Sequence, residues 1–174
     1  MTAKIPNAQL ASDVAPAINI KLTGDVVQVV NTSTGAVATG TTTIPLDDTI
    51  PQQTEGDLYL TAPAITPTSA SNFLRIDVTL VAANSAAAYY MIAALFQDAT
   101  ANALKTAVHT LGAANYPATI TFSHYMVAGT TSATTFKVRA GAHTAGTTTF
   151  NGAAGGRYFG GTMASSITVT EIKA

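Results

Sequence analysis

The clearest pattern of hydrophobic and polar positions lies in the segment from Phe73 to Val81. Its residues alternate, so that one face carries Leu74, Ile76, Val78 and Leu80 and the other carries Arg75, Asp77 and Thr79. A period of two with one apolar and one polar face is typical of an antiparallel strand that covers a core on one side. The segment therefore predicts a half-buried β-strand.

The segment from Ala88 to Gln97 is apolar on both of its alternating faces. Only the inner face of a two-sheet sandwich meets the core, so the outer face of such a strand needs another cover, and a partner subunit is the economical candidate. We therefore expect a subunit interface that contains Tyr89, Tyr90, Met91, Ile92, Leu95 and Phe96. A buried helix is the alternative, because the Ala-rich stretch would tolerate one.

Shorter alternating runs predict further strands, which are 26–31, 39–44, 58–64, a strand with Ile120, Phe122, His124 and Met126 on one face, a strand with Phe136, Val138, Ala140 and Ala142 on one face, and a terminal strand with Ile167 and Val169. Residues 102–111 fit a helical stripe and a strand alike, and the all-β surroundings favour a strand. About eight to ten strands with turn signals about every ten residues are typical of a sandwich or jelly roll. We predict an all-β fold, an antiparallel β-sandwich of jelly-roll type.

Residues 1–20 differ from the rest of the chain. They are Ala-rich, contain Pro6 and Pro16, and lack strict alternation. We interpret them as an N-terminal attachment arm, in extended form or with a short helix over 7–14, that precedes a jelly-roll domain at 21–174. The residues assigned to attachment are Lys4, Ile5, Leu10 and Val14.

Composition narrows the range of partners. The net charge of −1 gives no electrostatic reason to expect binding to nucleic acid. No apolar run approaches the roughly 18 residues of a membrane span, and the start lacks the apolar core of a signal peptide. Only 10% of residues are charged, so little repulsion keeps copies apart. This favours a protein that packs against others, although a composition bias of the host genome is the alternative.

No catalytic constellation accompanies these strands. The chain has no cysteine, which excludes thiolate nucleophiles and cysteine zinc sites. Ser123 and His124 are neighbours on a strand and point to opposite faces, so they cannot form a nucleophile and its base. The acidic residues Asp47, Asp48, Glu55 and Asp57 read as turn residues, with a calcium site as the alternative. We expect no enzymatic activity, no cofactor and no metal.

Two further features concern the C-terminal third. Glu171 shares a face with Ile167 and Val169, so we expect it to be bulged outward or paired near a subunit interface, with Arg157 as its partner. The glycine-rich stretch around Arg157, Tyr158 and Phe159 predicts a strand connection whose aromatic rings plug the core or a subunit contact. The functional alternative is a sugar platform in which Tyr158 stacks on a pyranose ring.

Two segments carry a resemblance to a known group. DVVQVVNTSTGAVATGTTTIPLDDTIPQQTEGD (Asp25–Asp57) and GGRYFGGTMASSITVTEI (Gly155–Ile172) resemble segments of bacteriophage tail-fibre and related virion surface proteins, and TAKI (Thr2–Ile5) is similar to the repeats of phage fibre stems. The resemblance implies a homotrimeric jelly-roll head, like the heads of the complement and tumour-necrosis-factor type. It further implies a place on the virion surface after assembly in the bacterial cytoplasm.

We therefore expect a structural virion protein, either a short fibre head or a capsid decoration. Its arm would bind other capsid or tail proteins. The protein would also contact the host surface, with a host glycan as a candidate partner. The single TAKI departs from long fibres, so a long stem is not expected. Two rivals from other classes are a free carbohydrate-binding module and a polysaccharide depolymerase.

Overall fold

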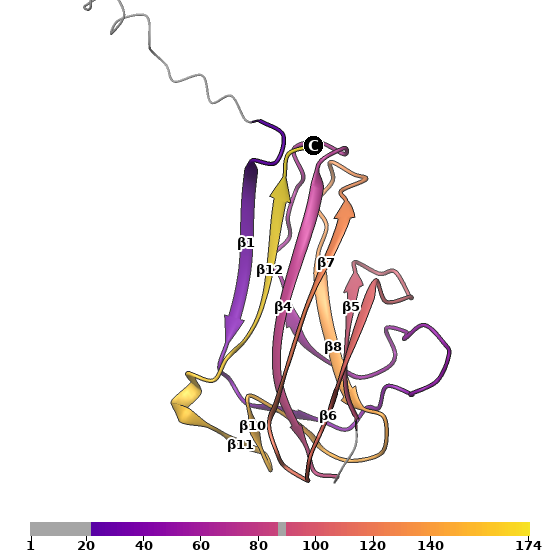
Figure 1. The fold of residues 1–174 in the computed structure, drawn as a ribbon, viewed down its shortest axis with the longest axis vertical. Coiled ribbons are helices and arrows are strands. Elements are labelled where there is room, and N and C mark those ends of the chain that lie inside the picture. The colour runs from indigo at the N-terminus through magenta and orange to yellow at the C-terminus, as the bar shows by residue number, and fades with distance from the viewer. Residues whose placement is uncertain (1–21, 87–89) are drawn as a thin grey trace, which may run out of the picture.

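The computed structural model describes residues 22–86 and 90–174, which form two antiparallel β-sheets packed face to face (Figure 1). In the first sheet, the last strand lies between the first strand and the longest one. Its order is β1 (Val26–Thr34), β12 (Ser165–Ile172), β4 (Phe73–Asn84) and β7 (Ala118–Val127). The end of β4 also pairs with β9 (Thr148–Phe150), which pairs with β2 (Ala38–Gly40).

The second sheet is built in the same interleaved way. Its order is β3 (Asp57–Thr61), β8 (Phe136–Ala142), β5 (Tyr90–Gln97) and β6 (Lys105–Thr110). Early and late strands of the chain are neighbours in both sheets, which is the Greek-key connectivity of a jelly roll. The predicted fold class is therefore confirmed.

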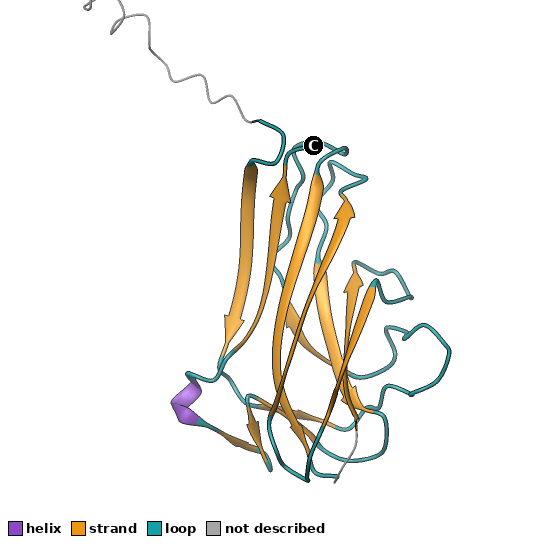
Figure 2. Ribbon diagram, viewed as in Figure 1, coloured by secondary structure: helices purple, strands orange, loops and turns teal. Residues whose placement is uncertain are grey.

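A small hairpin lies at the end of the molecule away from the C-terminus (Figures 1 and 2). It consists of β10 (Gly152–Ala153) and β11 (Gly156–Arg157), and it is followed by the short 3₁₀-helix η1 (Phe159–Gly161). Within the described ranges, no helix has the length and apolar character needed to cross a membrane.

The core lies between the two sheets and follows the predicted alternation. On β4, the side chains of Leu74, Ile76, Val78 and Leu80 are buried. Buried side chains of β12 and of the second sheet belong to the same core cluster. They are Ile167, Val169, Met91, Leu95, Phe136 and Val138. Alternation along the strands thus gives each sheet an apolar inner face. Removal of these two inner faces from water drives the packing of the sheets.

The outer face of β5 is covered by the chain itself, which corrects the predicted subunit interface. Ile44 packs against Ile92, Ala94 and Phe96, and its backbone N–H donates to the carbonyl of Ala142 at 3.1 Å. Met91, Ile92, Leu95 and Phe96 are at most 3% exposed within a single chain. The prediction that these four residues meet a partner is wrong, because a loop from the same subunit covers Ile92 and Phe96, while Met91 and Leu95 lie in the core between the sheets. Tyr90 is partly exposed, and Tyr89 lies outside the described residues.

Other predicted elements differ at their ends. The strand expected over 39–44 ends at Gly40, because Thr42 turns toward Asp57 and donates to its carboxylate through N–H at 3.0 Å and Oγ1 at 2.8 Å. The ambiguous segment 102–111 is a strand from Lys105 onward. The arm residues Lys4, Ile5, Leu10 and Val14 lie outside the described residues.

Candidate assembly surface

The outer face of the sheet β1-β12-β4-β7 carries an apolar patch at the end near the C-terminus. Two neighbouring cross-strand rows form it, one of Val29, Thr170, Arg75 and Tyr125 and one of Val26, Ile172, Phe73 and Val127. Val29, Tyr125 and Val127 are each 50% or more exposed. A bulge in β1 between Val26 and Gln28 keeps both Val26 and Val29 on this face. We call these eight residues the outer-face patch.

The remainder of this outer face is small and polar. The next two rows contain Asn31, Thr168, Asp77 and Ser123, and then Ser33, Ser166, Thr79 and Thr121. Arg75 and Asp77 are the charged residues of the four rows, and they form a salt bridge of 3.0 Å. The face therefore has no net charge, and two copies that approach through it do not repel each other.

Glu171 lies on the inner side of the same sheet and is fully buried. Its carboxylate accepts hydrogen bonds from Thr68 N and Oγ1 at 2.8 Å each, and from Asn72 Nδ2 and Gln28 Nε2 at 2.6 Å each. Burial acts to raise the pKa of Glu171, but these hydrogen bonds outweigh it and hold the pKa below its usual value. The alternation placed the side chain on the same face as Ile167 and Val169, but the expected outward bulge or pairing at a subunit interface is wrong, because the carboxylate is buried among groups of its own chain. The predicted pairing with Arg157 is wrong. Arg157 lies exposed in β11, and the carboxylate of Glu171 instead accepts hydrogen bonds from β1 and from the 66–72 loop.

The loop after β11 presents its aromatic rings to solvent. Phe159 is 76% exposed and Tyr158 is 40% exposed. Of the two predicted roles, plugging the core is therefore wrong, and a subunit contact stays a prediction. Phe159 has φ of 49°, a left-handed conformation that is unusual for a bulky residue. The sequence signal for this exposure is the density of glycines around the rings, which leaves them few side chains to pack against.

The remaining titratable residues do not converge on a site. Asp47 accepts from Thr49 N at 2.8 Å and from Thr49 Oγ1 at 2.6 Å, and these bonds lower the pKa of Asp47, as expected for a turn residue. Burial and the nearby Lys105 lower the pKa of His124. Asp77 and Glu171 lie on opposite faces of one sheet, so they cannot flank a glycosidic bond. Across 22–86 and 90–174, no cluster of three potential metal ligands occurs.

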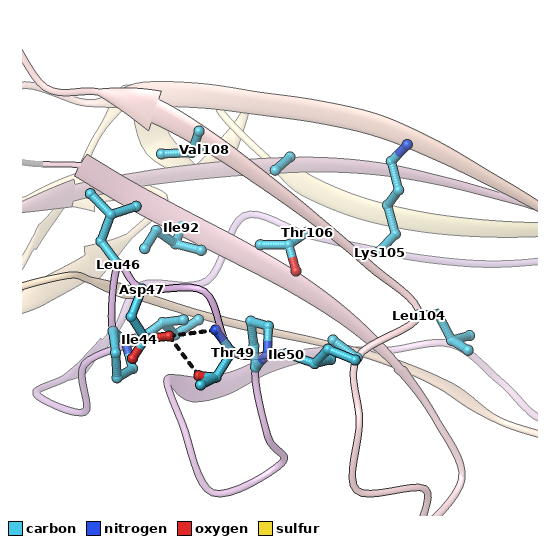
Figure 3. A pocket seen from close by; sticks show the side chains of 14 residues that line it. Ile44, Leu46, Asp47, Thr49, Ile50, Ile92, Leu104, Lys105, Thr106 and Val108 are labelled. Carbon is cyan, nitrogen blue, oxygen red and sulfur yellow. Dashed lines mark hydrogen bonds between the residues drawn. The ribbon is translucent and has the colours of Figure 1, made fainter.

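An open groove of about 510 Å³ separates the 44–51 loop from β6 (Figure 3). Ile92, Thr106 and Val108 line it from the sheet, and Leu46 and Ile50 line it from the loop. Lys105 extends away from Asp47 in this view, so the groove does not bring an acid and a base together. Sequence reasoning missed this groove because its two walls come from segments far apart in the chain.

No family model matches this chain, and neither does any curated protein. Several solved structures are similar to it, and they include the following three. The Eiger TNF of S. frugiperda aligns with 84% of this chain and 94% of its own, at 8% identity and a TM-score of 0.49. The sugar-binding C-terminal domain of EclA aligns with 86% of this chain and 96% of its own, at 16% identity and a TM-score of 0.33.

The third structure is the VP2 subviral particle of infectious bursal disease virus. It aligns with 86% of this chain but only 39% of its own, at 13% identity and a TM-score of 0.35. Likenesses at these scores carry no argument about function, and the jelly-roll assignment stands on the strand order described above.

Proposed function

We propose that this protein is a non-enzymatic structural protein of a bacteriophage virion, which forms a homotrimeric surface projection or capsid decoration. Residues 1–20 attach it to other capsid or tail proteins, and its exposed loops contact the host surface. The observation that supports this proposal best is the outer face of β1-β12-β4-β7, which combines an apolar patch with a polar remainder of no net charge.

The assembly mechanism is the burial of the outer-face patch against neighbouring copies. Val29, Tyr125 and Val127 are exposed on the same end of one sheet face, and Ile172 and Phe73 lie on the strands between them. Scattered single apolar residues would need no explanation, whereas a group on one face does. Each square ångström of apolar surface removed from water contributes about 25 cal/mol. A standard interface of about 1,600 Å² in total is enough for stable association. The threefold symmetry itself is taken from the resemblance to trimeric heads.

The experiment replaces Tyr125 with Glu in one variant and Val29 with Lys in another, and it measures mass in solution by light scattering. We expect the wild type to have the mass of a trimer and both variants to have the mass of a monomer, because a charge buried at the interface lacks a partner.

The matched control is Leu58→Lys, which changes an equally exposed aliphatic residue on β3 in the other sheet. It should leave the trimer intact. A wild type that is monomeric at micromolar concentration would contradict the proposal, and so would variants that remain trimeric.

A sugar-binding role is the second candidate, and the exposed rings of Tyr158 and Phe159 are the observation that favours it. A polysaccharide depolymerase would need two facing carboxylates, which Asp77 and Glu171 do not supply. Release of reducing sugar from a bacterial polysaccharide, abolished by one carboxylate substitution, would favour the depolymerase instead.

A further inference from the structure

The segment from β10 to η1 gathers two aromatic rings and a cation in one place. The ring centroids of Tyr158 and Phe159 are 6.1 Å apart with planes at 76°, an edge-to-face arrangement. The Arg157 side chain reaches over η1, since a Cβ built on Gly161 would lie 3.4 Å from Arg157 Nη1. Among the described residues, no carboxylate lies within salt-bridge distance of Arg157. We call residues 151–161 the aromatic finger.

The base of the aromatic finger is fixed by a buried polar residue. Asn151 is fully buried, and its Nδ2 donates to the carbonyls of Thr34 at 2.6 Å and Ala36 at 3.0 Å. Its Oδ1 accepts from Ser165 Oγ at 2.7 Å. At the other end, Gly161 packs directly on Gly35, because a Cβ on Gly35 would lie 1.8 Å from the Gly161 carbonyl oxygen. Both ends of the finger are therefore held in place.

At the tip of the aromatic finger, Phe159 has a backbone conformation and an exposed side chain that both fail to stabilise the fold. Its φ is positive, as are those of Gly160 and Gly161 after it, and its ring is mostly in solvent. A glycine at position 159 would adopt this φ without strain. An exposed ring that is held on strained backbone and gains no core packing points to a role outside the fold.

Glycines leave the backbone around the rings open to a ligand. A Cβ built on Gly155 or on Gly160 would meet nothing within 4 Å. The finger thus offers an aromatic face, a guanidinium group and accessible backbone N–H and C=O groups. A pyranose ring with a carboxylate has the matching parts: an apolar C–H face, an anion suited to paired N–H donors, and hydroxyl groups.

A protein partner fits the finger less well than a sugar does. A stable protein interface buries about 600–1,000 Å² on each partner and has an apolar centre. Here three side chains stand among glycines, so the contact area is that of a small ligand.

We propose that the aromatic finger binds an acidic pyranoside, with Phe159 stacking on the sugar ring, Tyr158 contacting its edge and Arg157 pairing with its carboxylate. The inference rests on the proposed contact with the host surface and names its ligand class. It does not depend on the oligomeric state, because all three side chains come from one subunit.

The experiment titrates the full chain with methyl galactopyranosiduronic acid and, as the matched neutral sugar, methyl galactopyranoside. Amide chemical shifts in NMR spectra report the site, and light scattering on the same sample reports the mass. We expect the acidic sugar to shift the signals of 157–162 with a dissociation constant at least tenfold lower than that of the neutral sugar. Arg157→Gln should remove this preference.

Phe159→Gly should weaken binding at least tenfold while the melting temperature stays the same or rises, since the strain is relieved. Tyr116→Ala, which removes another exposed tyrosine, should change nothing. Equal binding of both sugars, chemical-shift changes elsewhere in the chain, or no chemical-shift changes at all would overturn the inference. The last of these results would favour a protein partner for the aromatic finger. A monomeric mass with intact sugar binding would contradict only the proposed trimer.

Discussion

At the scale of single residues, Glu171 shows how a charge can be placed among core side chains. A buried carboxylate is unfavourable unless its oxygens are fully hydrogen-bonded, and four donor groups from Thr68, Asn72 and Gln28 provide this. The bonds connect β12 to β1 and to the loop before β4. Glu171 is therefore a structural residue, and the chain uses its charge to hold three segments together.

Glu171→Ala should lower the free energy of unfolding by about 2–4 kcal/mol, because several buried donors lose their acceptor. Thr170→Ala, on the outer face next to it, is the control and should have a much smaller effect. Chemical denaturation measures both, and similar losses in the two variants would contradict this role of Glu171.

The same residue predicts a dependence on pH. The pKa of Glu171 is lower in the folded protein than its usual 4.5, so its contribution to stability is fully present above about pH 4.5 and disappears as the pH falls through the folded-state pKa. Wild-type stability should therefore fall more steeply in acid than that of Glu171→Gln, and parallel curves would contradict this.

Residue-level reasoning from the sequence found the face of Glu171 but wrongly expected an outward bulge or a subunit-interface pair with Arg157. Alternation with Ile167 and Val169 places the side chain inward, and the structure agrees. The hydrogen-bonding partners are 99, 103 and 143 positions away in the chain. No local pattern identifies them, because the sheet order brings them together.

At the scale of elements, the loop between β2 and β3 explains why β5 is apolar on both faces. Ile44 fills the outer side, while Arg139 donates to the carbonyls of Glu55 at 2.9 Å and Gly56 at 2.8 Å and fixes the loop on the sheet. The sequence predicted the strand and the need for a cover. It misidentified the cover, because a loop without periodicity gives no sign of where it will lie.

Gly141→Ala tests this cover. A Cβ at Gly141 would lie 2.3 Å from the carbonyl oxygen of Thr42, so the loop must move away from β8. We expect a loss of about 1–3 kcal/mol and faster amide hydrogen exchange in 41–56 and β5. Gly112→Ala, where a Cβ would meet nothing within 4 Å, is the control. Unchanged exchange in the 41–56 loop would contradict its role as a cover.

At the scale of the whole molecule, the two ends of the sandwich differ. The C-terminus and the start of the described chain lie at one end, beside the outer-face patch, and the aromatic finger lies at the other (Figure 1). Under the proposed function, attachment and self-association use one end and ligand contact uses the opposite end. Fold class was predictable from strand spacing, whereas this division depends on which strands become neighbours, and the sequence does not show that.

Under the proposed function, deletion of residues 1–20 should leave a soluble trimer that no longer joins the virus particle, because the deletion keeps the outer-face patch and removes the proposed attachment arm. Light scattering measures the first part, and co-sedimentation with particles that lack the protein measures the second. A deleted chain that still sediments with the particles would contradict the role of the arm, and the wild-type chain is the control.

The position of β12 between β1 and β4 has a consequence for the order of events during folding. In the described structure β1 pairs only with β12, so the strand that is made first must wait for the strand that is made last. Pairings between distant segments close slowly, because the entropy of a long loop is lost before any contact compensates for it. On the ribosome, the valines of β1 therefore remain without a neighbouring strand until β12 has emerged. During that interval the newly made chain depends on meeting few other copies of itself.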